Sequence, residues 1–264
     1  MKAYILPLLS LALALPLGAQ ERQTDARAFT WSGRVASGAW VRVHNLNGGI
    51  TVERASGNQV EIVASKSWRR GDPKDVRIEL KRFGPNDEHV IVCAFWTENA
   101  TCDENGYRTR SSGGSRRNDV AVAFTVRVPP GVRINASTVN GRVGIDGATS
   151  EVRAATVNGE IDATSSGGPV MASTVNGNVN VRMGRLAGDQ DLTYATVNGN
   201  IAVEFDADVD ADVELTTVNG RLHSGFPLQL QGRIDPRHLR ATIGKGGRRV
   251  KLTTVNGNVE LRKR

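Results

Sequence analysis

The 264-residue chain has little of two residue classes that often define small secreted folds. It contains 2 cysteines, and its 6 Phe, 4 Trp and 3 Tyr make aromatic residues 5% of the total. Two cysteines are too few for a disulfide-built miniprotein or a four-cysteine zinc site. Glycine is abundant, at 29 residues, but follows no Gly-X-Y period. Collagen is therefore excluded and a turn-rich fold is favoured.

Long apolar runs are also absent after residue 19. Residues 1–19 combine a charged start at Lys2, an apolar stretch over Ala3–Leu17 and a small residue at Ala19. This pattern is typical of a secretory signal cleaved near Ala19 and Gln20; a membrane anchor is the alternative, but the run is short for a spanning helix. We expect an exported protein that is periplasmic, on the outer surface or secreted, with no transmembrane segment after signal removal.

The expected export changes how the net charge and the two cysteines are interpreted. The net charge is +7, and outside the cytoplasm it favours envelope polymers and lipid head groups over nucleic acid. Cys93 and Cys102 can oxidise in such a compartment, and the 8 residues between them form a loop that a disulfide could close. Two separate thiols are the alternative.

Residues 20–131 are predicted to form a strand-rich N-terminal region. Alternating runs such as Val60–Val63 and Val76–Leu80 are separated by Gly, Pro and Asn clusters, and all 4 tryptophans lie before residue 97. Residues 97–118 are interpreted as a mobile, solvated loop, with anion binding by its arginines as the alternative. Pro129-Pro130-Gly131 marks the boundary with residues 132–264.

A tetrapeptide repeat dominates residues 132–264. Thr-Val-Asn-Gly begins at Thr138, Thr156, Thr174, Thr196, Thr217 and Thr254, with spacings of 18, 18, 22, 21 and 37 residues. Ala241–Gly244 is interpreted as a degenerate copy inside the last interval. Such a period predicts an all-β solenoid, a parallel β-helix of about seven coils. A ladder of hairpins is disfavoured because Asn-Gly recurs once per unit and each unit is too long for one hairpin arm.

The asparagines of the repeat are predicted to form a structural ladder. Alternation along each unit points Val, Ala, Leu, Thr and Asn inward, so that stacked amides can hydrogen-bond along a column. The following glycine is expected to supply a bend with positive φ. The predicted ladder residues are Asn140, Asn158, Asn176, Asn198, Asn219 and Asn256.

The valine inside each tetrapeptide has the opposite parity and should therefore face outward. Six stacked valines would make an apolar stripe that is typical of a binding or packing surface. The alternative is that another part of the chain covers the stripe. The stripe residues are Val139, Val157, Val175, Val197, Val218 and Val255.

These Asn-Gly pairs, together with the entry Val128–Gly131, the copy at Asn47–Ile50 and the ending Ile243–Gly257, carry a resemblance to a known family. The chain resembles the bacterial putative-adhesin family of unknown function, over most of its length after the signal. The resemblance implies an exported or membrane-attached single-stranded right-handed β-helix. Family repeats often have a small polar residue where this chain has valine, which makes the stripe more particular to this protein.

Catalytic and metal motifs are missing. His44, His89, His223 and His238 have no ligand spacing, and neither Gly-x-Ser-x-Gly nor His-Glu-x-x-His occurs. The alternating aspartates of 206–212 invite a calcium interpretation, but the EF-hand pattern fails and a solvated strand face is favoured. We expect no metal and no cofactor.

Two basic clusters lie near the C-terminus. Arg262–Arg264 is expected on the exposed edge of the last coil, where basic side chains discourage strand addition. The competing interpretation is a site for an envelope polyanion, with Arg248, Arg249 and Lys251 as candidate anion-binding residues.

The sequence as a whole predicts an exported, non-catalytic, adhesin-like scaffold that binds a protein or an envelope polymer. A polysaccharide-active β-helix enzyme is one alternative, disfavoured because the repeated positions carry Val, Thr and Asn and not clustered Asp, Arg or Lys. A purely structural or homo-oligomeric envelope protein is the other.

Overall fold

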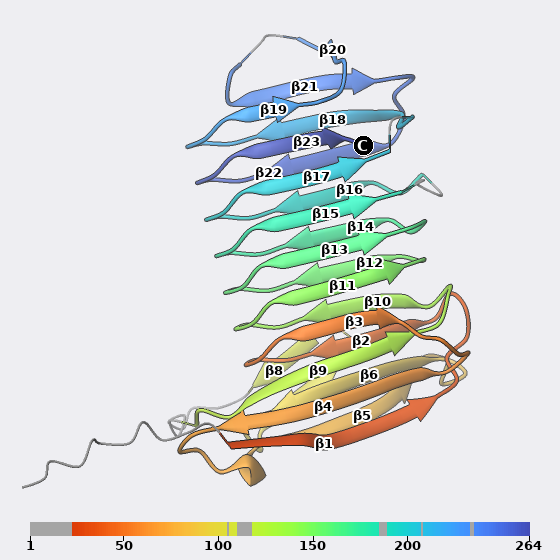
Figure 1. The fold of residues 1–264 in the computed structure, drawn as a ribbon, viewed down its shortest axis with the longest axis vertical. Helices are drawn as coiled ribbons and strands as arrows, with labels where there is room; N and C mark the ends of the chain where they lie inside the picture. Colours follow the sequence, from red (N-terminus) through yellow and green to blue (C-terminus); the bar gives the residue numbers. More distant parts are fainter. Residues whose placement is uncertain (1–22, 105, 110–117, 185–188, 207, 233–234) are drawn as a thin grey trace, which may run out of the picture.

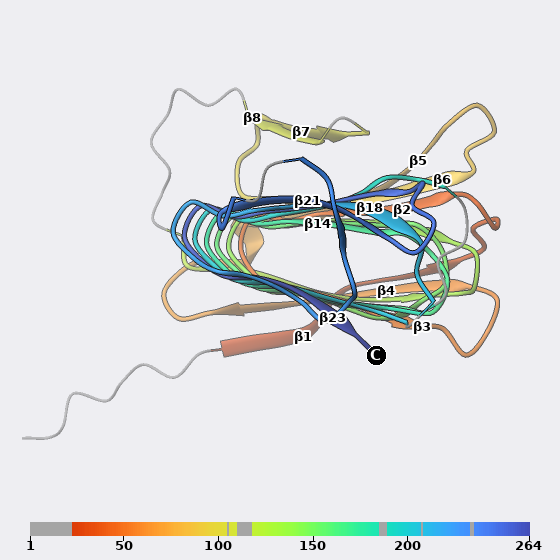
Figure 2. The same cartoon turned by 90° about the horizontal axis from the view of Figure 1, so that it is seen from above.

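The computed structural model describes residues 23–104, 106–109, 118–184, 189–206, 208–232 and 235–264. They form two long β-sheets that face each other, with strands from residues 23–83 at one end of the stack and strands from residues 222–243 at the other (Figure 1). Seen from above, the sheets are two layers (Figure 2). The fold is all-β with parallel sheets, as the repeat predicted. The predicted signal sequence, residues 1–19, lies outside the described residues.

The first sheet has ten strands and the second has eleven. In spatial order, the first contains β1 (Gln23–Gly33), β4 (Val60–Trp68), β9 (Ala121–Val128), β3 (Ile50–Arg54), β11 (Val143–Ala148), β13 (Ile161–Ser165), β15 (Val179–Met183), β17 (Ile201–Phe205), β23 (Val259–Lys263) and β19 (Leu222–Ser224). The second contains β20 (Gln229–Leu230), β21 (His238–Ile243), β18 (Ala211–Thr216), β22 (Arg249–Thr253), β16 (Leu192–Ala195), β14 (Val170–Ser173), β12 (Val152–Ala155), β10 (Arg133–Ser137), β2 (Trp40–His44), β6 (His89–Phe95) and β5 (Arg77–Phe83).

Each repeat unit contributes one strand to each sheet, and equivalent residues of successive units pair in parallel. Val152 lies opposite Val170, and Ile161 lies opposite Val179, so identical positions stack. Their side chains are buried in one core between the sheets. Burying such an aliphatic side chain contributes roughly 1.5–3 kcal/mol. The alternation of apolar and polar residues thus specifies the register of both sheets.

The stack continues through the sequence boundary at Gly131. β10 pairs in parallel with β2, and β11 pairs in parallel with β3, so two strands of the N-terminal region already have the geometry of the repeat. Antiparallel strands close this end of the stack, because β4 pairs with both β1 and β9, and β5 pairs with β6. None of the described residues forms a helix long and apolar enough to cross a membrane.

The C-terminal unit does not lie at the end of the stack. β22 is hydrogen-bonded between β16 and β18, and β23 between β17 and β19, so the last unit of the chain occupies an interior place (Figure 1). The expectation that Arg262–Arg264 guard an exposed edge is therefore wrong. Ala241–Gly244 is not a copy of the repeat either, since β21 runs antiparallel to β18.

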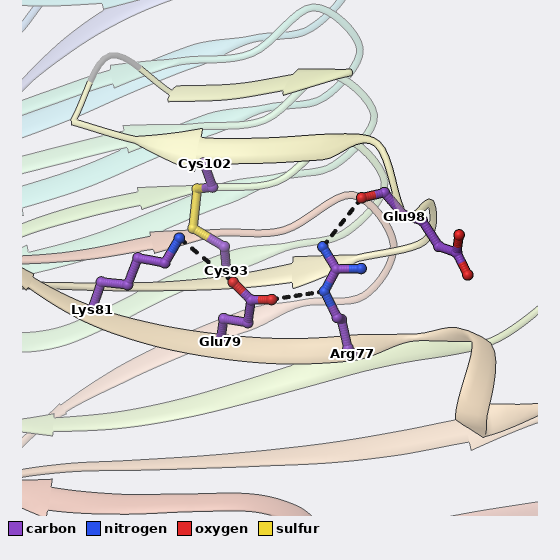
Figure 3. Close-up of polar contacts among 6 residues, drawn as sticks. All are labelled: Arg77, Glu79, Lys81, Cys93, Glu98 and Cys102. Carbon is purple, nitrogen blue, oxygen red and sulfur yellow. Dashed lines mark hydrogen bonds and ion pairs between the residues drawn. A yellow bond between two sulfur atoms is a disulfide. The ribbon is translucent and has the colours of Figure 1, made fainter. Parts of the chain in front are cut away.

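A short hairpin interrupts the expected loop at residues 97–118. β7 (Ala100–Asp103) pairs with β8 (Gly106–Thr109), and the hairpin lies outside the two layers (Figure 2). A disulfide between Cys93 of β6 and Cys102 of β7 attaches it to the second sheet (Figure 3). The predicted disulfide is thus present. It anchors a hairpin in a segment for which composition alone predicted a loop. Residues 110–117, with three of the four arginines, lie outside the described residues.

Candidate functional site

The Thr-Val-Asn-Gly copies form the bends that connect the two sheets on one side of the stack, as between β12 and β13. The threonine of each copy is buried, and its hydroxyl donates to the carbonyl of the glycine in the neighbouring unit. Thr174 donates to Gly159 at 3.0 Å, and Thr196 donates to Gly177 at 3.0 Å. This hydroxyl gives the glycine carbonyl at the bend a hydrogen-bond partner that it would otherwise lack.

The six asparagines lie in one column along the same bends. Their amides are linked Nδ2 to Oδ1 at 2.7–2.9 Å, in the spatial order Asn140, Asn158, Asn176, Asn198, Asn256 and Asn219. The column is exposed to solvent, whereas the sequence pattern placed the asparagines inward. The two-residue alternation ends at the bend, so the parity of the preceding strand does not extend to the asparagine.

Close packing, more than backbone conformation, explains the glycine of each copy. A Cβ on Gly159 would lie 2.0 Å from the carbonyl oxygen of Gly141, and one on Gly177 would lie 2.0 Å from that of Gly159. Gly159 has no positive φ in the left-handed region. The sequence-based expectation of a positive φ therefore missed the cause, which is the approach of stacked backbones.

A second polar column runs two residues after the first. Asn178, Asn200 and Asn258 have side-chain oxygens that accept main-chain N–H groups from the next unit, at 2.8–3.0 Å. Asn178 Nδ2 also donates to Glu160 at 3.1 Å. Sequence reasoning did not assign these residues. The signal was the extension of three copies to Thr-Val-Asn-Gly-Asn.

The valines of the repeat line the outside of the bends. Five of them are among the exposed large hydrophobic residues of the protein, and the sixth, Val139, is half-buried. The exposed fractions are 38% for Val157, 39% for Val175, 40% for Val197, 37% for Val255 and 48% for Val218. Since neighbouring strands of a sheet lie about 4.8 Å apart, these side chains form a continuous apolar column, which we call the valine column.

The predicted anion-binding residues do not face one direction. Arg248 is buried and lies close enough to Tyr194 to affect its hydroxyl, whereas Arg249 is exposed. Lys251 Nζ lies 3.7 Å from a carboxylate oxygen of Glu214, which Arg240 also approaches at 3.8 Å. The Lys251 ammonium is therefore already paired.

The aspartates of 206–212 hold a turn. Asp210 accepts the main-chain N–H of Lys245 at 2.8 Å, and Asp212 accepts the N–H of Gly247 at 3.0 Å and the hydroxyl of Thr242 at 2.8 Å. These hydrogen bonds, that of Gly247 first, lower the pKa of Asp212. Within the described residues, no group of three His, Cys, Asp or Glu side chains could hold a metal ion.

The outer face of the first sheet carries a shallow groove with a volume of about 1030 Å³. Two of its acidic residues are paired with arginines: Asp162 lies 2.9 Å from Arg142, and Glu204 lies 3.6 Å from Arg182. Asp146 instead accepts the hydroxyl of Thr164 at 2.6 Å. These contacts hold the carboxylates against neighbouring side chains on the face of the sheet.

His44, at the end of β2, is a buried histidine. Its Nδ1 lies 2.5 Å from the hydroxyl oxygen of Ser137, while Nε2 is buried without a hydrogen-bond partner among these residues. Burial, and to a smaller extent the nearby Arg42, lower the pKa of His44 to about 4. The other histidines lie in different parts of the stack; for example, His89 accepts the N–H of Trp40 at 3.2 Å.

The fold and its bends define a parallel β-solenoid scaffold. Residues 99–262 match the family model described as Toastrack DUF4097, which is more than half of the chain, and the chain belongs to this family. No curated protein matches it.

Two solved structures are similar to most of the chain. A putative cell adhesion protein from Clostridium sporogenes has 10% identity and a TM-score of 0.41, covering 92% of this chain and 99% of its own. A putative adhesin from Bacteroides fragilis has 9% identity and a TM-score of 0.35, covering 93% and 99%.

Proposed function

We propose that the protein is an exported, non-catalytic scaffold of the bacterial envelope, wound as a right-handed β-helix, which binds a protein or an envelope polymer through the valine column. The observation that carries the proposal is the exposure of five stacked valines, between 37% and 48%, along one edge of the solenoid. Solvated sheet edges normally carry polar residues, and a contiguous apolar surface is typical of an interaction site.

The rigidity of the bends supports this role. The threonine hydroxyls, the amide column and the close-packed glycines fix the backbone on both sides of each valine. A preorganised surface loses little conformational entropy on binding, so a modest apolar area can give useful affinity. The signal-like N-terminus supports export.

The test is a charge substitution in the middle of the column. The variant Val175→Lys with Val197→Lys should retain its melting temperature, because both side chains are exposed, and should lose retention of the partner from a solubilised envelope fraction. The matched control, Ser173→Lys with Thr193→Lys, adds the same charge at exposed positions of the same two units. Equal retention by all three proteins would refute the proposal, as would unfolding of the valine variant alone.

A further inference from the structure

We propose that a second site, on the outer face of the eleven-stranded sheet, binds the oxyanion groups of an acidic polysaccharide. Its residues come from three neighbouring strands, β2, β10 and β12. Trp40 lies opposite Arg133, while Arg42 and Arg153 lie on either side of Asn135. Because Val41 and Val43 point into the core, Trp40 and Arg42 face outward.

Three guanidinium groups converge on the indole of Trp40. The distances from the guanidinium carbon to the ring centroid are 5.0 Å for Arg153, 5.6 Å for Arg133 and 5.8 Å for Arg42. The ring is 8% exposed, so it serves as a platform that holds the arginines and is not itself available for stacking on a ligand. Cation–π attraction of this kind offsets part of the repulsion among the like charges.

The positive charge of this cluster is only partly balanced. Arg153 is paired with Glu151 at 2.8 Å, but no described carboxylate lies within ion-pair distance of Arg133 or Arg42. Arg42 donates to the main-chain carbonyl of Glu104, and its buried Nε has no partner among the described residues. Burial, opposed by Glu104 and aided by repulsion from Arg153, lowers the pKa of Arg42. An oxyanion would supply the missing charge and hydrogen-bond acceptors.

The chemistry of the cluster selects the ligand class. Guanidinium groups bind carboxylate, sulfate and phosphate oxygens through paired N–H donors, and they do so better than ammonium groups. Beside the arginines, the outer face of β10 and β12 carries the small side chains of Ser137 and Ala155, which lie opposite each other. These small side chains leave room for a polymer chain beside the guanidinium groups. The site is chemically distinct from the valine column.

The experiment uses the full chain after signal removal, with polygalacturonate, dextran sulfate, polyphosphate and neutral dextran as probes in isothermal titration calorimetry. We expect binding of polygalacturonate or dextran sulfate, with neutral dextran inert. Arg133→Gln should weaken binding by about tenfold, because it removes one charged donor that has no ion pair in the fold. Arg42→Gln combined with Arg133→Gln should abolish it.

The matched control is Arg221→Gln, which removes the same charge from an exposed arginine outside the cluster and should change affinity less than about twofold. Arg133→Lys, which keeps the charge but not the paired donors, tests the guanidinium requirement and should bind more weakly than the parent. The proposal is overturned if the parent binds neither acidic polysaccharide, if polyphosphate alone binds, or if Arg221→Gln weakens binding as much as Arg133→Gln. Melting temperatures of all variants establish that they are folded.

Discussion

At the scale of single residues, each letter of the tetrapeptide has its own physical role. The threonine hydroxyl satisfies a carbonyl of the neighbouring unit, the valine is exposed, the asparagine joins the amide column and the glycine permits close stacking. Identical residues therefore recur because identical contacts recur, with the same partners one unit away. Substitutions at the four positions should differ in cost according to these contacts.

The buried threonine offers a substitution that changes almost nothing but the hydroxyl. Thr174→Val keeps the shape and removes the donor to Gly159, so the carbonyl is left without this partner. We expect a loss of about 1–2 kcal/mol in the free energy of unfolding, measured by urea denaturation. Thr174→Ser retains the donor and should lose less. A valine variant as stable as the parent would show that the hydroxyl contributes nothing.

His44 should make stability depend on pH. With a pKa of about 4 in the folded protein against an ordinary value of 6.5, the unfolded chain binds more protons between these values. The stabilisation is full above about pH 6.5 and is lost as the pH falls towards 4, by up to about 3 kcal/mol. His44→Gln should flatten this part of the curve of unfolding free energy against pH. An unchanged curve in the variant would contradict the assignment.

At the scale of elements, the bends are packed more tightly than the strands. Stacked glycine backbones approach so closely that no β-carbon fits between Gly177 and Gly159 without backbone movement. Stacks of strands tolerate side chains on both faces, because their alternation directs them away from the neighbouring strand. The bends are thus the elements that restrict the sequence most.

Gly177→Ala tests this packing. Its Cβ would lie 2.0 Å from the Gly159 carbonyl oxygen, and relief requires movement of the backbone. We expect a loss of about 1–3 kcal/mol in the free energy of unfolding. Gly57→Ala is the matched control, since nothing lies within 4 Å of its Cβ position and its φ is not positive. Equal melting temperatures for the two variants would contradict the packing argument.

The hairpin β7–β8 is held by its disulfide and by the packing of Ala100 and Tyr107 against Phe95. Ion pairs of Glu79 with Arg77, at 2.7 Å, and Lys81, at 3.6 Å, lie on the neighbouring strand β5 and are exposed, so they contribute little (Figure 3). Replacing both Cys93 and Cys102 by serine should lower stability by about 2–3 kcal/mol. Hydrogen exchange should show lost protection at Ala100–Asp103, with β12–β17 unaffected. Retained protection of the hairpin would indicate that packing alone holds it.

At the scale of the whole molecule, the parallel stack was predictable from the sequence, but the spatial order of its units was not. The repeat gave the parallel stack because identical units must bury identical faces against each other. The exposed position of Asn158 was missed because periodicity describes strands and not bends. The interior position of Val259 was missed because sequence order suggests spatial order, whereas pairing of β23 with both β17 and β19 satisfies more backbone groups than an edge would.

The arginine cluster around Trp40 was not predicted from the sequence, for a different reason. Arg133 and Arg153 are 20 residues apart, and Arg42 is far from both in sequence, so only the parallel register brings them together. Nor does the sequence single out Trp40, because an apolar residue in an alternating strand usually faces inward. Which outward-facing side chains lie side by side can be predicted only when the strand pairing of the units is known.

The interior position of the last unit makes truncation informative. Removing residues 249–264 would leave β16 and β17 without their neighbours β22 and β23, and would separate β18 and β19 from the stack. We expect residues 208–248 to become sensitive to protease while β2–β15 remain protected, with a lower melting temperature. A truncated protein that melted like the parent would show that the end region closes over the gap by itself.

That arrangement has a consequence for how the chain is made. β22 and β23 are synthesised after β16–β19 and must enter between them, so the solenoid cannot form one unit at a time in sequence order. A nascent or prematurely terminated product that lacks β22 and β23 presents two open slots, one in each sheet. The strands on both sides of those slots stay without one of their hydrogen-bonded neighbours until β23 has been made.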